Sequence, residues 1–60
     1  MARINKKNAE KLAVSYSAYN EAVTEERWDS VKVWGRMLIE AQKQTGIELL
    51  DEETIKRLMR

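Results

Sequence analysis

The side chains that could take part in catalysis are few and lie apart in the sequence. Ser15, Ser17 and Ser30 carry hydroxyls, but the 60-residue chain has no histidine to activate them. Carboxylate pairs occur at residues 25–26 and 52–53, and both pairs stand near an expected helix start, where acids are favoured in any protein. Cysteine is also absent, which removes the other common zinc ligand. The sequence therefore predicts a non-enzymatic protein without a metal or another cofactor.

The stretch from residue 24 to residue 46 carries both tryptophans and predicts a long central helix. Thr24 is a favourable N-cap, because its hydroxyl can accept a backbone N–H of the first turn. Val23 and Trp28 stand at the two positions of a hydrophobic staple around this cap. Gly46 predicts the end of the helix, since glycine readily adopts the left-handed conformation.

Before this helix, apolar residues recur at intervals of three and four and predict an amphipathic first helix. These residues are Ala9, Leu12, Tyr16, Tyr19 and Val23. Asn5 or Asn8 can cap the helix, and residues 1–5 are expected to be frayed. No proline or glycine separates the first two helices, so we expect a tight connection near Val23, as in an antiparallel hairpin. One continuous helix is the alternative, and the capping residues after Val23 argue against it.

The sequence after Gly46 predicts a short C-terminal helix. Asp51 can cap it, and the acids that follow fall in its first turn, where the helix dipole favours them. We expect helices near residues 6–23, 25–45 and 51–59. The predicted fold class is all-α: an antiparallel helical hairpin plus a short C-terminal helix, in a single small domain spanning residues 1–60.

The central helix has an unusually wide apolar arc. Its apolar residues span roughly 200° of the circumference, whereas one neighbouring helix needs a stripe of little more than about 100°. Either the C-terminal helix covers the remainder, or a second chain does. A chain this short buries little surface and is often stabilised by association, so the sequence predicts a homodimer that forms a helical bundle. The candidate interface residues are Trp34, Met37, Leu38, Val31 and Ala41.

Small residues mark two places where helices could come close. In the expected hairpin Ala13 lies level with Gly35, and a glycine inside a helix costs up to ~1 kcal/mol relative to alanine. A close crossing of the two helices would account for Gly35. A band of small residues also runs beside the apolar face of the first helix, either as a second contact face or as a solvent-exposed one. It consists of Ser15, Ala18 and Ala22.

The leading functional interpretation is a protein-interaction module, such as a small regulator, inhibitor or assembly subunit. Trp34 points to it most directly, because tryptophan is enriched among the residues that dominate binding energy. The net charge is +1, so the chain as a whole has no strong field that would attract nucleic acid or membrane. No apolar run approaches the length of a membrane span, and no signal-peptide pattern is present. We expect a cytoplasmic protein.

Nucleic acid is the alternative partner. Basic residues gather near both ends of the chain, and lysine or arginine contacts to phosphates supply most non-specific affinity. The hairpin could bind as a dimer, or the last two helices could act as a helix-turn-helix-like pair, although the linker after Gly46 is longer than the turn of that motif. The acidic residues of this linker could instead neutralise the basic N-terminus within the chain. The candidate nucleic-acid contacts are Arg3, Lys6, Lys7, Lys56 and Arg57.

Overall fold

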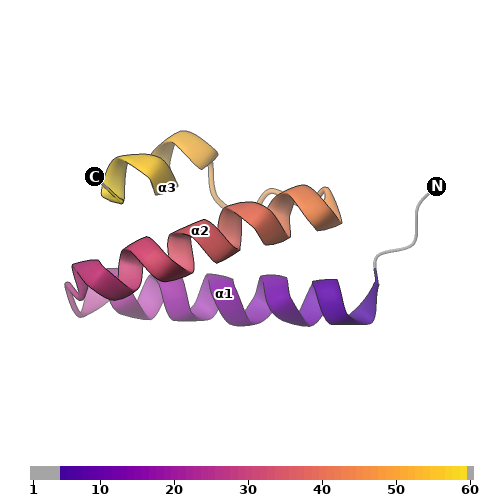
Figure 1. The fold of residues 1–60 in the computed structure, drawn as a ribbon, viewed down its shortest axis with the longest axis horizontal. Helices are drawn as coiled ribbons and strands as arrows, with labels where there is room; N and C mark the ends of the chain where they lie inside the picture. Colours follow the sequence, from indigo (N-terminus) through magenta and orange to yellow (C-terminus); the bar gives the residue numbers. More distant parts are fainter. Residues whose placement is uncertain (1–4, 60) are drawn as a thin grey trace.

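A computed structural model describes residues 5–59, which form three helices (Figure 1). The helices are α1 (Lys6–Thr24), α2 (Trp28–Thr45) and α3 (Glu52–Leu58). α1 and α2 pack side by side as an antiparallel hairpin, and α3 packs on α2. The prediction of an all-α hairpin plus a short C-terminal helix is therefore confirmed. The helix bounds agree with the predicted ones except at the start of α2.

α1 begins where the sequence predicts, because Asn5 caps it. The Oδ1 atom of Asn5 accepts a hydrogen bond of 2.9 Å from the backbone N–H of Lys7. This bond satisfies one of the donors that the first turn of a helix leaves unpaired. The expectation that residues 1–5 are frayed does not hold at Asn5, and residues 1–4 lie outside the described part of the chain.

The turn after α1 is a Schellman motif with a glutamate in its left-handed position. Glu26 has a φ of 55°. Its N–H donates to the Val23 carbonyl at 3.1 Å, and the N–H of Arg27 donates to the Ala22 carbonyl at 2.9 Å. These two bonds define the motif, in which the left-handed residue is most often glycine. The turn therefore holds a side chain in a conformation that only glycine adopts without strain.

The motif places Thr24 inside α1 and not at the start of α2. Its hydroxyl donates to the Asn20 carbonyl at 2.9 Å, one turn earlier in the same helix. α2 begins at Trp28, after Arg27, and no side chain caps it. The prediction that Thr24 caps the central helix is therefore wrong, because the Glu26 conformation ends α1 later than the capping pattern suggests.

We expect Glu26→Gly to stabilise the protein. The left-handed conformation costs a non-glycine residue about 1–2 kcal/mol, and glycine removes this cost. Glycine also gives the unfolded chain more conformational freedom, which reduces the gain in stability by about 0.5–1 kcal/mol. Thermal unfolding followed by circular dichroism should show a Tm about 3–6 °C higher. Glu26→Ala removes the charge but keeps a Cβ, so it should bring no comparable gain. A glycine variant that melts no higher than the parent would contradict the strained turn.

The buried side of α1 is rotated from the predicted one toward small residues. Its buried residues are Leu12, Ser15, Tyr19 and Ala22, whereas Ala9 is exposed and Tyr16 and Val23 are half-buried. The Ser15 hydroxyl donates to the Lys11 carbonyl at 2.6 Å, so burial leaves it satisfied. Ser15 and Ala22 let the backbones of the hairpin come close. This part of the small-residue band is therefore core and not a solvent-exposed face.

Tyr19 places a polar atom in this core. The residue is only 2% exposed, and its hydroxyl has no hydrogen-bond partner within residues 5–59. Burial raises the pKa of the Tyr19 phenol above its ordinary value of 10.0, because a phenolate there would be poorly solvated. The folded protein therefore favours the neutral phenol.

α2 ends at Gly46, as predicted. Gly46 has a φ of 72°, and its N–H donates to the Gln42 carbonyl at 2.8 Å. Glycine is favoured in this left-handed cap because it has no Cβ to clash.

α3 lies over α2 at Gly35. A Cβ added to Gly35 would lie 2.7 Å from Sδ of Met59 and 3.2 Å from Cγ2 of Ile55. Ile55 is itself fully buried. The prediction that Gly35 faces Ala13 is wrong, since Ala13 is exposed on α1 and the nearest neighbours of Gly35 belong to α3 and the residue that follows it. The missing side chain makes room for α3.

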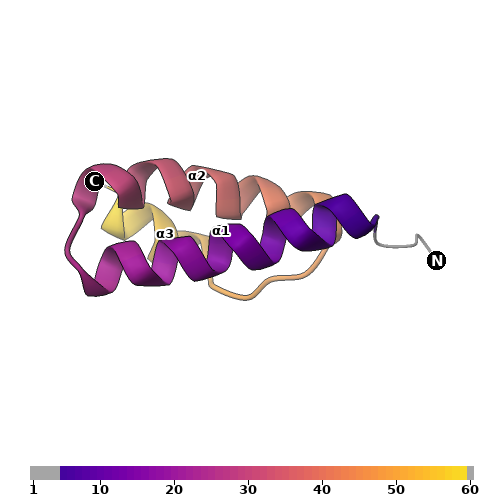
Figure 2. The same cartoon turned by 90° about the horizontal axis from the view of Figure 1, so that it is seen from below.

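Gln42 holds the connector between α2 and α3 in place. Its Nε2 donates to the Leu50 carbonyl at 3.0 Å, and its Oε1 accepts from the N–H groups of Leu49 and Leu50, each at 2.9 Å. The connector runs back along the hairpin so that α3 returns beside α2 (Figure 2). The buried amide of Gln42 thus supplies hydrogen bonds that a helix or a sheet would otherwise give to the connector backbone.

The molecule is elongated, with extents of 37 × 19 × 13 Å. Within the described residues, no helix combines the length and apolar character needed to cross a membrane.

Candidate protein-interaction surface

Three of the five candidate interface residues are buried within the chain itself. Val31, Leu38 and Ala41 are each 0% exposed and belong to the hydrophobic core. The chain covers much of the wide arc of α2 itself, because both α1 and α3 pack on α2. These three residues therefore cannot contact a second copy while the fold is intact. The remaining two, Trp34 and Met37, are half-buried.

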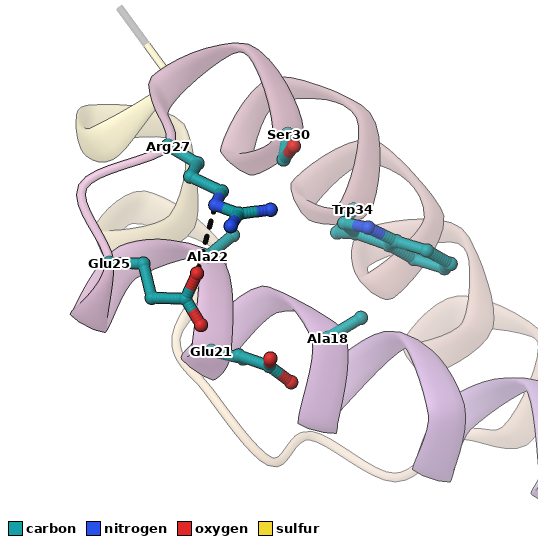
Figure 3. Close-up of a pocket in the computed structure, with 7 residues that line it drawn as sticks. All are labelled: Ala18, Glu21, Ala22, Glu25, Arg27, Ser30 and Trp34. Carbon is teal, nitrogen blue, oxygen red and sulfur yellow. Dashed lines mark ion pairs between the residues drawn. The ribbon is translucent and has the colours of Figure 1, made fainter.

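Trp34 forms one wall of a groove between α1 and α2 (Figure 3). Its indole lies along the edge of α2, and the methyl group of Ala18 points toward it from α1. The groove has a volume of about 190 Å³. We call it the hairpin groove; it is lined by Ala18, Glu21, Ala22, Glu25, Arg27, Ser30 and Trp34. Trp34 therefore stays a candidate interface residue.

Charged groups surround the aromatic wall of the hairpin groove. Nε of Arg27 lies 2.8 Å from Oε1 of Glu25, and both side chains extend across the end of the groove near the turn (Figure 3). Glu21 lies beside them and has no ion-pair partner among residues 5–59. An apolar centre with a charged, solvated rim is the usual composition of a protein-binding site.

A second depression continues from this groove over the outer face of α1. It has a volume of about 380 Å³ and shares Ala18 and Glu21 with the hairpin groove. We call it the α1 hollow; it is lined by Ala13, Val14, Ser17, Ala18 and Glu21. Val14 is 57% exposed. The sequence predicted contact roles on this surface only at Ala13, in the crossing with Gly35, and at Ala18, in the band of small residues, because small side chains at helical spacing are also typical of a solvent-exposed face.

The basic residues proposed for nucleic acid do not form one patch. Lys6 and Lys7 lie in the first turn of α1, while Lys56 and Arg57 lie in α3, and these segments stand toward opposite ends of the long axis (Figure 1). Arg3 lies outside the described residues. A single stretch of backbone phosphates would have to span the length of the molecule to reach both groups.

Among residues 5–59, no ion pair joins Lys6 or Lys7 to the acidic residues between Gly46 and α3 or to those of α3. Within residues 5–59, Glu52 pairs with Lys43 at 3.5 Å and with Lys56 at 3.7 Å. On α1, Lys11 pairs instead with Glu40 of α2 at 3.4 Å. The Lys11–Glu40 and Lys43–Glu52 pairs therefore tie neighbouring helices together, whereas the Lys56–Glu52 pair lies within α3.

Between residues 5 and 59 no group of three or more acidic, histidine or cysteine side chains is placed to hold a metal ion. The fold and the surface define a small all-α protein, a helical hairpin with a third helix packed on one side. Comparisons with protein families, curated proteins and solved structures find no match to this chain.

Proposed function

We propose that the chain is a non-enzymatic protein-interaction module, a small regulator, inhibitor or assembly subunit, that binds another protein chain through the hairpin groove. The observation that carries this proposal is the position of Trp34. It is a large aromatic side chain at the edge of the core, only partly covered, in a groove with a charged rim. Tryptophan in such a partly desolvated position is typical of residues that dominate binding energy.

The surroundings of Trp34 support the same proposal. The backbone of α2 and the core contacts of Trp34 hold the indole in place before binding, so little side-chain entropy is lost when a partner covers it. The guanidinium of Arg27 and the carboxylate of Glu21 stand at the rim, where charges contribute to orientation and specificity more than to affinity. The partner is a protein surface with an apolar side chain for the groove and polar groups for its rim.

Photocrosslinking at position 34 tests this function. We expect the chain with p-benzoylphenylalanine in place of Trp34, expressed in the organism that makes it, to form a covalent adduct with a protein that mass spectrometry identifies. The same probe at Lys32, an exposed residue on another face of α2, is the control and should give little or no adduct. Equal adducts at both positions, or none with protein at position 34, would overturn the proposal.

The same protein can be tested against mixed DNA and RNA. A nucleic-acid binder retains them at micromolar strength near physiological salt and loses them steeply as salt rises, whereas an interaction module shows no such retention. Salt-sensitive retention would favour the nucleic-acid alternative, and neutralising Lys6, Lys7, Lys56 and Arg57 would then locate the contact.

A further inference from the structure

Five residues of α1 and its C-cap Glu25 form a stripe along one flank of the helix, and the charges of the stripe change sign from one end to the other. The intervals between them are four, three, four, three and four, so they lie on one face of the helix. The α1 stripe consists of Lys7, Lys11, Val14, Ala18, Glu21 and Glu25. None of the six is buried, and the two central ones line the α1 hollow. The stripe is therefore basic at its start, apolar at its centre and acidic at its end.

The stripe is symmetric about residue 16. Lys7 and Glu25 stand nine positions to either side of it, Lys11 and Glu21 five positions, and Val14 and Ala18 two positions. If a second copy of α1 lies antiparallel across the first, each lysine faces a glutamate and each Val14 faces an Ala18. A parallel arrangement would place lysine against lysine and glutamate against glutamate, which is repulsive.

This charge order is unfavourable for α1 alone. A helix favours acids near its N-terminus and bases near its C-terminus. α2 and α3 follow that preference, with Asp29 and Glu52 in their first turns and Lys43 and Arg57 in their last. α1 has no acidic residue in its first turn and no basic residue in its last. The reversed order in α1 therefore needs a reason outside the helix.

We propose that α1 is the contact of an antiparallel homodimer, in which Lys7 and Lys11 of each copy pair with Glu25 and Glu21 of the other. The inference rests on the proposed function in taking this side of the hairpin as a protein-binding surface, and it names a second copy as the partner.

The geometry at the centre of the stripe agrees with this arrangement. The short side chains of Ala13, Ser17 and Ala18 leave the α1 hollow, and the exposed Val14 of the second copy fills it. A two-fold axis repeats each contact, so the hollow of each copy receives Val14 of the other copy. Lys11 and Glu25 already have partners within the chain, Glu40 at 3.4 Å and Arg27 at 2.8 Å. Such exposed ion pairs contribute little, so exchanging them for contacts between copies costs little.

Charge reversal tests the pairing directly. We expect the parent chain to sediment as a dimer, with twice its 7.0 kDa mass, at tens of micromolar and low salt. The double variant Lys7→Glu/Lys11→Glu has an acidic stripe, and Glu21→Lys/Glu25→Lys has a basic one. Each should self-associate with a dissociation constant raised by roughly tenfold or more. Mixing the two should restore association, because acidic and basic stripes then face each other at all four positions.

Folding does not obscure this experiment. Each reversal brings one end of α1 into agreement with its dipole, so loss of association together with full helical circular dichroism reflects the interface. Lys32→Glu/Arg36→Glu lowers the net charge as much as the lysine reversal does, but on an exposed face of α2, and should leave the dimer intact.

Three outcomes would overturn the dimer: a parent chain that is monomeric throughout, reversed variants that associate like the parent, or a mixture of the two that stays monomeric. None of these bears on the crosslink at position 34, so the proposed function is judged separately. Ala18, Glu21 and Glu25 belong to both the hairpin groove and the α1 stripe. A dimer that resists both reversals and crosslinks at position 34 therefore places the contact at Trp34 and not at the charged residues of the stripe.

Discussion

Gln42→Leu is expected to lower the free energy of unfolding by about 2 kcal/mol, although leucine has a similar volume and is more apolar. The substitution removes three hydrogen bonds to the connector. It leaves the N–H groups of Leu49 and Leu50 and the Leu50 carbonyl without their partner, and an unsatisfied buried group costs about 1–3 kcal/mol. The connector is only partly buried, so water recovers part of that cost. The Tm should fall by about 8–16 °C.

The loss should be local to the connector and α3. Amide hydrogen exchange should show reduced protection at Leu49 and Leu50, with α1 less affected. Gln42→Glu keeps the acceptor for both N–H groups and loses only the donor to Leu50, so its effect should be smaller. Gln44→Leu is the matched control, because Gln44 is exposed and its amide bonds only Glu40, at 3.3 Å. Equal melting of the Gln42 and Gln44 leucine variants would mean that the connector does not depend on the amide.

The helices could be predicted from sequence because their signals are local. Asn5 and Gly46 act through their own backbone conformation and one nearby hydrogen bond, which makes such caps legible without tertiary information. The apolar spacing of α2 likewise predicted a helix with one wide apolar side, and Val31 and Leu38 on that side are both fully buried.

The turn could not be predicted because a less favourable residue occupies it. A Schellman motif is recognised in sequence by its glycine, and here Glu26 stands in that position. Thr24 and Glu25, together with Glu26 itself, form a good capping pattern, although α2 begins later, at Trp28. Contacts of the hairpin hold Glu26 in a conformation that its own preference opposes.

The sequence shows which side of each helix is apolar, but it does not show what covers that side. Periodicity gives the direction of each side chain from its helix but not the neighbour that covers it. The sequence singled out Trp34, which does line an open groove. It could not show that α1 and α3 between them bury Val31, Leu38 and Ala41. Gln42 gave a signal that this side of α2 is covered within the chain. It continues the spacing of Gly35 and Leu38, so its polar side chain points toward the same buried side.

The α1 stripe is a pattern that is present in the sequence but can be recognised as a surface only once the fold is known. A helix with bases at its start and acids at its end resembles an ordinary solvated face until burial is known. Once Leu12, Ser15, Tyr19 and Ala22 are assigned to the core, the outward residues are fixed. Only then does the symmetry of the lysines and glutamates about residue 16 become visible.

Gly35→Leu is expected to destabilise the protein even though leucine favours helix. The propensity gain is at most ~1 kcal/mol. Against it, even a Cβ would lie 2.7 Å from Sδ of Met59 and 3.2 Å from Cγ2 of Ile55, closer than van der Waals contact allows. A full leucine must displace the side chains of Met59 and Ile55, and over-packing of this kind costs about 1–3 kcal/mol. The net loss of about 1–2 kcal/mol should lower the Tm by about 5–15 °C.

Two further variants assign this loss to α3. Arg36→Leu places the same side chain one position along α2, where the residue is exposed, and should change stability by no more than about 0.5 kcal/mol. Met59→Ala removes the nearest obstacle, so combining it with Gly35→Leu should cost less than the sum of the two single changes, because residues in contact do not behave additively. Strict additivity, or a leucine variant that melts as high as the parent, would mean that α3 does not rest on Gly35 in solution. The exposed face of α2 would then extend beyond Trp34 to Gly35 and Leu38, and a partner could bind there as well.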